Sequence, residues 1–278
     1  MPRLSIGQRR VGLELRRLRA RTGRTLEDLA TDMEWSASKL SRVENGESRV
    51  LTRDVRLLCE LLGAEDGVAD ALVELTKAAK VKGWWEPYRD VLGGNYIPFE
   101  AEATEVNEFQ MELVCGLLQI PEYTRAIMRG ARTDASDEEI ARRVQIRMDR
   151  QAALDRPVGP LRIWAILSEG ALHRRIGGPD VLRAQLRHLA ERAERPNIDV
   201  QVLPFEAGAH PALTSTFTIL RFEQADPLVF GNGINDEPEI EDPAELRRTL
   251  ATFDWLRAAA ESPRRSRRII VEAADAVG

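Results

Sequence analysis

Residues 25–46 read TLEDLATDMEWSASKLSRVENG, and this stretch decides the fold of the N-terminal part of the chain. Thr25 is a good N-cap residue, and Asp28 follows three positions later, as a capping box requires. The apolar face of the segment consists of Leu26, Leu29 and Ala30. The pattern predicts a short helix of about eight residues that begins after Thr25.

A second short helix is predicted directly after this one. Ser36 can cap it, Leu40 and Val43 form its buried side, and it ends at Asn45-Gly46, a pair that tolerates the left-handed backbone of a helix C-terminus. Two short helices joined by a tight turn are typical of the helix-turn-helix, whose second helix enters the major groove of DNA. We expect Trp35 to pack in the turn.

Helical periodicity continues on both sides of this pair. A first helix, which ends near Thr22-Gly23, is indicated by the spacing of Val11, Leu15 and Leu18. Thr52 is expected to cap a fourth helix with Val55, Leu58 and Leu62 facing inward. A further helical pattern from about Glu65 to Ala79 is interpreted as a connector between domains.

Several exposed positions of the second short helix suit contacts with DNA. Ala37 and Ser38 are small, so the backbone can approach base edges, whereas Lys39 and Arg42 can reach guanine or the phosphates. The predicted DNA-binding residues are Arg16, Arg17, Thr25, Ser36, Ala37, Ser38, Lys39, Ser41, Arg42 and Asn45.

Charge divides the 278-residue chain, although its net charge is only −5. Residues 1–62 carry a net charge of +4 and the remaining residues −9. Eight arginines fall within residues 1–24, where the only acid is Glu14. Such a patch attracts polyanions even when the whole protein is acidic. The alternative is a helical packing module with a solvated basic face, but caps, turn, small residues and charge together favour DNA binding.

The motif TLEDLA followed by SASKLSRVENG resembles the Xre or phage-repressor helix-turn-helix family, whose N-terminal domain is all-α and lambda-repressor-like. The resemblance implies that Glu44 braces the end of the recognition helix rather than contacting DNA. It also shows one departure. Leu26 occupies the place where the family commonly has a glutamine that contacts a phosphate.

The larger C-terminal part alternates between two patterns. Strands are expected at 103–110, 161–167, 199–203, 217–222 and 228–230, because these segments are β-branched or aromatic and bounded by polar residues, Pro or Gly. Helices are expected at 121–129, 137–154, 168–176, 179–194 and 243–260. The fold class is therefore α+β multidomain, with a helical N-terminal domain and a mixed α/β domain of about 190 residues.

This part is similar to the large C-terminal domain of Xre-type regulators of actinobacteria, a group that includes WhiJ-like and antitoxin-like regulators. The residues that carry the similarity include Gly116–Gln119, Arg147–Ala152, Leu161–Gly170 and Val202–Phe205. Cys115 replaces a usual proline, and Phe230-Gly231-Asn232 replaces an aromatic-Val-Glu run. The resemblance implies dimerisation and a response to a small ligand or to a small protein encoded by a neighbouring gene.

Catalytic and metal-binding patterns are weak. The sequence has no phosphate-binding glycine loop and no histidine pair at metal spacing, so we expect no enzyme, no metal and no cofactor. Cys59 and Cys115 are expected to be buried apolar residues, and His173 and His188 to lie on helix surfaces. The candidate ligand or partner surface consists of Trp84, Trp85, Tyr88 and His210.

The predicted organisation has four parts. Residues 1–64 form the DNA-binding domain, 65–82 the connector, 83–262 the regulatory domain, and 263–278 a basic C-terminal segment whose Arg264–Arg268 run is a solvated linker. The acidic run 235–243 is expected to be a solvated loop. We expect a cytoplasmic homodimeric transcriptional regulator on an inverted DNA repeat, without a membrane segment. The alternative is an antitoxin-like interaction module whose DNA binding is autoregulatory.

Overall fold

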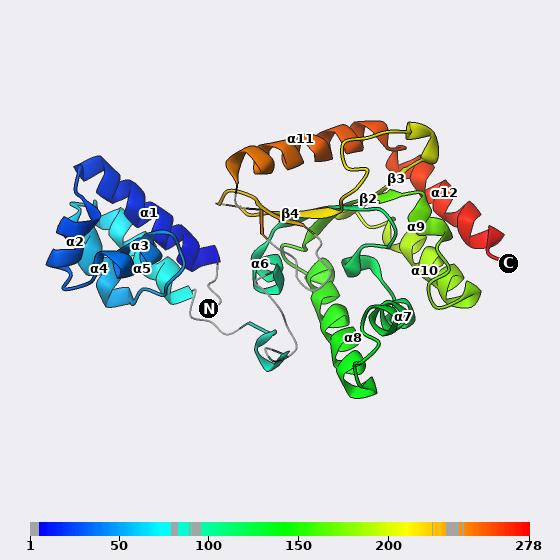
Figure 1. The fold of residues 1–278 in the computed structure, drawn as a ribbon, viewed down its shortest axis with the longest axis horizontal. Helices are drawn as coiled ribbons and strands as arrows, with labels where there is room; N and C mark the ends of the chain where they lie inside the picture. Colours follow the sequence, from blue (N-terminus) through cyan, green and yellow to red (C-terminus); the bar gives the residue numbers. More distant parts are fainter. Residues whose placement is uncertain are drawn as a thin grey trace. The chain divides into compact units, whose positions relative to one another are not determined.

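A computed structural model describes residues 6–78, 83–88, 90, 96–223, 225–231, 239–240 and 242–278. The chain divides into two compact units, Met1–Glu86 and Pro87–Gly278 (Figure 1). The first unit is helical and the second combines helices with a five-stranded sheet. The fold class expected from the sequence is therefore confirmed.

The helices of the first unit are α1 (Ile6–Thr22), α2 (Leu26–Asp32), α3 (Ala37–Glu44), α4 (Thr52–Leu61) and α5 (Asp66–Ala78). The helices predicted after Thr25 and after Ser36 are confirmed. One cap differs from the prediction. Leu51 holds the N-cap position of α4 without a side-chain cap bond, and Thr52 is the first helical residue.

The helix α5 contributes to the apolar cluster of the first unit. Leu72 and Val73 of α5 are buried in the same cluster as Leu15 of α1 and Leu58 of α4. The sequence suggests a connector over 65–82, but residues 66–78 form a fifth packed helix because their apolar face needs a partner. Residues 79–82 lie outside the described residues.

The second unit is built on one mixed sheet of strand order β3-β2-β1-β4-β5. Its strands are β1 (Glu105–Gln110), β2 (Arg162–Ser168), β3 (Ile198–Leu203), β4 (Phe217–Arg221) and β5 (Leu228–Gly231). The strands β1, β2 and β3 run parallel to one another. The strand β4 pairs antiparallel with β1 on one side and with β5 on the other. All five predicted strands are present, and the central one is β1.

Successive residues of β1 point to opposite faces of the sheet. Phe109 packs in an apolar cluster with Phe253 and Leu256 of α11 (Pro243–Ala259). Glu108 and Gln110 belong to the other face and are also buried. Figure 1 shows α11 on one side of the sheet and α6 (Tyr96–Glu102), α7 (Pro121–Ala131) and α8 (Asp137–Gln151) on the other.

The remaining elements of the second unit are mostly the expected ones. They comprise α9 (Gly170–His173), α10 (Pro179–Arg192) and the short 3₁₀ turns η1 (Glu86–Tyr88, at the junction of the two units), η2 (Gly116–Leu118), η3 (Ala152–Asp155) and η4 (Phe205–Ala207). The helix expected over 168–176 is reduced to α9. The first residue of the expected helix, Ser168, pairs with Leu203 in the sheet. Directly after the expected helix, Gly177 has a left-handed backbone with a φ of +73°. The short helix α6 was not predicted.

The C-terminal segment differs from the predicted solvated linker. It forms the helix α12 (Pro263–Ala276), in which Ser266, Ile270 and Ala274 are buried. The Ser266 hydroxyl accepts a hydrogen bond from the Val202 backbone N–H at 2.9 Å. The three buried residues are spaced four apart, and the intervening run of arginines hides this helical period in the sequence. Of the run 235–243 that is expected to be a solvated loop, residues 235–238 and 241 lie outside the described residues. The described part is ordered differently from the expectation: the Ile240 N–H donates to the Val229 carbonyl at 2.8 Å, and Asp242 caps α11.

Candidate nucleic-acid interface

The helix α3 has a well-defined start and stop. The Ser36 hydroxyl accepts a hydrogen bond from the Lys39 backbone N–H at 3.1 Å, which satisfies one free donor at the helix N-terminus. Gly46 has a φ of +70°, and the Glu47 N–H donates to the Arg42 carbonyl at 2.7 Å. These bonds fix the length of the helix that is predicted to enter the groove.

One side of α3 is buried and the other is offered to solvent. Leu40 and Val43 are buried in the core of the first unit. Ser38, Arg42 and Asn45 are exposed. Their spacing of four and three residues places them in one stripe along the helix. We call Ser38, Arg42 and Asn45 the α3 stripe.

The turn between α2 and α3 rests on Glu34 and Trp35. Glu34 has a φ of +52°, which is unusual for a residue other than glycine. The backbone N–H of Trp35 donates to the Ala30 carbonyl at 2.8 Å, and the Trp35 side chain packs against the core as expected. The Lys39 ammonium lies 3.6 Å from the centroid of the Trp35 ring. Lys39 therefore contacts the turn, whereas Arg42 does not.

Three of the predicted contact residues also have structural partners. Thr25 closes the expected capping box: its hydroxyl donates to an Asp28 carboxylate oxygen at 2.7 Å and accepts from the Asp28 N–H at 3.1 Å. The hydrogen bonds that the Thr25 hydroxyl and the Thr25 backbone N–H donate to the Asp28 carboxylate lower the pKa of this carboxyl. Ser36 caps α3, and Ala37 packs partly against the core. Ser41 is half-buried.

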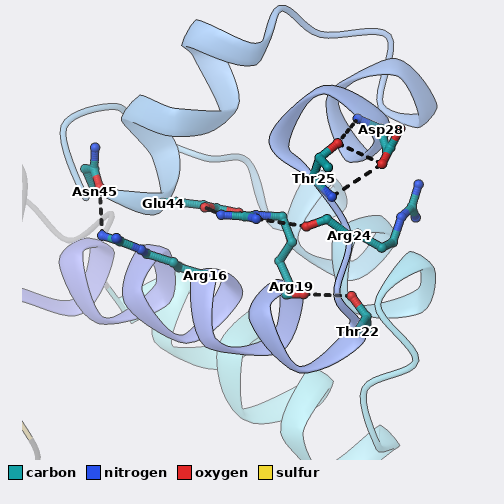
Figure 2. A network of polar contacts seen from close by, with 8 residues as sticks. All are labelled: Arg16, Arg19, Thr22, Arg24, Thr25, Asp28, Glu44 and Asn45. Carbon is teal, nitrogen blue, oxygen red and sulfur yellow. Dashed lines mark hydrogen bonds and ion pairs between the residues drawn. The ribbon is translucent and has the colours of Figure 1, made fainter.

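An ion pair connects α1 to the end of α3 (Figure 2). Arg19 Nε and Nη2 lie 2.7 and 2.8 Å from the two carboxylate oxygens of Glu44, whose side chain is 3% exposed. Arg19 Nη1 also donates to the Arg24 carbonyl at 2.9 Å. The hydrogen bonds to Glu44 raise the pKa of Arg19. This geometry matches the bracing role that the family resemblance implies for Glu44.

The basic side of α1 reaches the α3 stripe at one end. Arg16 Nη1 lies 3.4 Å from the Asn45 side-chain oxygen (Figure 2), and both side chains are exposed. Arg17 is 71% exposed and lies 3.4 Å from Glu14. The structure thus brings Arg16 and Asn45 together, while Arg19 is occupied by Glu44.

Gly12 sets how closely α1 and α3 approach, and it is not among the residues predicted from the sequence. A Cβ atom added at Gly12 would lie 2.2 Å from the Val43 carbonyl oxygen. A larger residue would therefore push α3 away from α1. A glycine inside a helical pattern is the available signal, since it destabilises a helix and usually has a packing reason.

The candidate ligand or partner residues fall into separate local environments. Trp84 and Trp85 contact each other edge to face, with ring centroids 6.0 Å apart. The Tyr88 hydroxyl donates to Asp149 of α8 at 2.8 Å, which raises the pKa of Tyr88. His210 packs against Phe109 and Trp255, and burial lowers its pKa. The described contacts do not join Tyr88 to His210.

A buried polar cluster lies on the sheet face opposite α11. Arg150 of α8 forms two hydrogen bonds, of 2.7 and 2.6 Å, with the carboxylate of Glu100. The Tyr96 hydroxyl donates to the same carboxylate at 2.8 Å. Nearby Glu108 accepts a hydrogen bond of 2.6 Å from Gln110, and burial raises the pKa of its carboxyl. No pattern in the sequence predicts this cluster.

Two of the segments that carry the C-terminal resemblance meet beside this cluster. Arg147 Nη1 donates to the Gln119 side-chain oxygen at 2.8 Å. Gln151 donates to the backbone carbonyls of Gln119, at 2.7 Å, and of Gly116, at 3.3 Å. Residues 116–119 and 147–151 therefore form one hydrogen-bonded unit.

Cys59 and Cys115 are both buried with free thiols, as expected.

Neither a metal site nor a membrane-spanning helix is found in the described part of the chain. No group of three or more His, Cys, Asp or Glu residues there could hold a metal ion. None of its helices is long and apolar enough to cross a membrane.

Comparison with known families supports both units. A helix-turn-helix domain family matches residues 10–72, and this match indicates DNA binding by the first unit. A family described as a domain of unknown function (DUF5753) matches residues 94–272. No curated protein and no solved structure matches the chain. Because the second match spans more than half of the sequence, the protein belongs to the DUF5753 family and carries a helix-turn-helix domain before that domain.

Proposed function

We propose that the protein is a sequence-specific transcriptional regulator of the Xre type. The observation that carries the proposal is the α3 stripe, which is exposed along a helix whose two ends are capped and whose last turn is braced by Arg19. A rigid, exposed helix that carries an exposed arginine, Arg42, suits the major groove.

The predicted contact residues divide into two roles. Arg42 and Ser38 read base edges, because they lie at the centre and start of the exposed stripe. Arg16 and Arg17 neutralise phosphates on the flank of the groove. Thr25, Ser36, Ala37, Lys39, Ser41 and Asn45 complete the surface by positioning the helix or contacting the backbone.

The chain acts as a cytoplasmic homodimer on an inverted repeat, because two half-sites multiply the affinity of a small module. Residues 83–262 set dimerisation and the response to a ligand or partner, at surfaces that include Trp84, Trp85, Tyr88 and His210. They carry out no catalysis and need no cofactor. This proposal follows the resemblance of the C-terminal part to the group that includes WhiJ-like and antitoxin-like regulators.

The test uses an operator selected from a random DNA pool by the wild-type chain. Arg42→Ala should change the preferred sequence, and Arg17→Ala should weaken binding to all sequences and lower the salt slope by about 0.9. Arg175→Ala, which removes an exposed arginine from the second unit, is the control. Unchanged operator affinity and preference in Arg42→Ala would show that α3 is not the recognition helix.

An antitoxin-like interaction module is the second candidate, and it follows from the similarity of the C-terminal part. Purification from the native host distinguishes the two functions. A small protein that co-purifies and changes operator affinity when it is added back would favour the antitoxin-like module.

A further inference from the structure

The helix α11 is apolar on two sides. Phe253 and Leu256 face the sheet and are fully buried. On the other side, Ala251 and Ala258 are exposed, and Trp255 is 42% exposed. A helix on the surface of a domain normally has one apolar stripe, so the outer side of α11 has the composition of a covered surface.

The apolar surface extends beyond α11. The Trp255 ring stacks on His210, with centroids 6.4 Å apart. The Leu213 N–H donates to the His210 carbonyl at 3.1 Å, and the Leu213 side chain is 53% exposed. The exposed residues Trp255 and Leu213 are thus both connected to His210, one by a ring contact and the other by a backbone hydrogen bond. Contiguous exposed apolar surface of this kind marks interaction sites.

Charged residues flank this surface in a self-complementary order. Arg247 and Asp254 are seven residues apart, so they lie on the same side of the helix. Arg248 and Trp255 are also seven apart and share the opposite flank. All four residues are exposed, with Asp254 at 62% although it lies 3.3 Å from Arg257. Both pairs are centred close to Ala251.

A two-fold axis through Ala251 uses both pairs at once. Two antiparallel copies of α11 would place Arg247 opposite the partner's Asp254, and Arg248 over the ring of the partner's Trp255. Each contact occurs twice by symmetry, as in an isologous interface. The small side chain of Ala251 lets the helix axes approach at the crossing point. A purely basic or a purely acidic partner would leave the charges of one sign on this surface unmatched. A second copy of the chain matches both signs.

We propose that a second copy of this chain packs on the outer side of α11, antiparallel and with the two-fold axis at Ala251. This inference rests on the proposed homodimer and names its interface. The ion pair between Arg247 and the partner's Asp254 sets the register, and the cation–π contact between Arg248 and the partner's Trp255 covers the indole.

The test is a charge exchange in the full-length chain, followed by sedimentation velocity over a range of concentrations. Arg247→Glu and Asp254→Arg should each raise the dimer dissociation constant about tenfold or more, because like charges then face each other. The double variant with both changes should return to within a few fold of the wild type. Ala251→Glu places two carboxylates at the axis and should abolish the dimer.

Two controls keep the test decisive. Glu122→Arg changes an exposed charge on α7 and should leave the dimer intact, and circular dichroism checks that every variant is folded. A monomeric wild type, or variants that dimerise like the wild type, would overturn the proposal. Operator half-site binding is measured on the same samples, so a failed α11 interface and a failed DNA-reading function give different results.

Discussion

Each unit contains an arginine that forms two hydrogen bonds with one buried glutamate, and the two pairs differ in their surroundings. In the first unit, Arg19 joins α1 to Glu44 at the end of α3, and the arginine side chain is 16% exposed. In the second unit, Arg150 joins α8 to Glu100 of α6, and these side chains are 9% and 4% exposed. The first pair lies beside the exposed α3 stripe, whereas the second is enclosed and its carboxylate also binds Tyr96.

This difference shows how each unit uses charge. The Arg19–Glu44 pair holds the end of α3 against α1, and the other side of α3 faces solvent. The main effect of this pair is therefore to position α3. The Arg150–Glu100 pair brings together segments fifty residues apart in the sequence, and it holds α8 to α6 inside the second unit. A buried pair adds little net stability, but removing one partner leaves an uncompensated charge.

The largest effect is expected for Arg150→Met. Glu100 would lose both bonds to the guanidinium and stay buried, so the second unit should lose about 3–5 kcal/mol of unfolding free energy. Urea unfolding combined with hydrogen exchange of β1 and α8 amides measures the loss in that unit. Unchanged protection of these amides would show that the pair is not needed to hold α6 and α8.

The double variant Glu100→Gln/Arg150→Met tests the cause. It removes both charges and keeps an acceptor for the Tyr96 hydroxyl, so most of the lost stability should return. A double variant as unstable as Arg150→Met would indicate that lost packing, rather than the unpaired charge, causes the effect.

A smaller effect is expected for Arg19→Met in the first unit. The pair is nearer to solvent, so the loss should be about 2 kcal/mol, together with weaker operator binding because the end of α3 is no longer braced. Hydrogen exchange of α3 amides and operator titration measure the two effects. Operator binding that stays at the wild-type level while α3 loses protection would separate bracing from recognition.

The first unit could be predicted almost completely from its sequence because its signals are local. The capping box at Thr25, the cap at Ser36 and the Gly46 stop all lie within a few residues of the helices they define. Gly12 and the partner of Arg19 were missed, since both depend on contacts between helices distant in sequence.

The second unit could be predicted as strands and helices but not as a site. Glu108 and Gln110 look like ordinary polar residues of an alternating strand, yet both are buried because α6 and α8 cover that face. The pairing of residues 116–119 with 147–151 joins side chains across about thirty positions. Long-range contacts of this kind leave no periodic signal in one sequence.

The smallest effect concerns Glu108, and it depends on pH. Burial raises the pKa of this carboxyl in the folded chain. As the pH rises above the ordinary glutamate value of about 4.3, the unfolded chain releases the proton and the folded chain keeps it, so stability falls until the folded pKa is passed. Glu108→Gln removes this loss and still accepts the hydrogen bond from Gln110.

The stability advantage of Glu108→Gln over the wild type should therefore be smallest at about pH 4 and grow toward neutral pH, by about 1.4 kcal/mol for each unit of pKa shift. Urea unfolding at a series of pH values measures it, and Glu122→Gln on the exposed side of α7 corrects for the loss of a carboxylate. The Arg19–Glu44 pair of the first unit provides the contrast, because Glu44 accepts two hydrogen bonds from Arg19, whereas burial raises the pKa of Glu108. An advantage of Glu108→Gln that shrinks as the pH rises would mean that the hydrogen bond from Gln110 and the charges of Arg150 and Arg147 outweigh desolvation at Glu108.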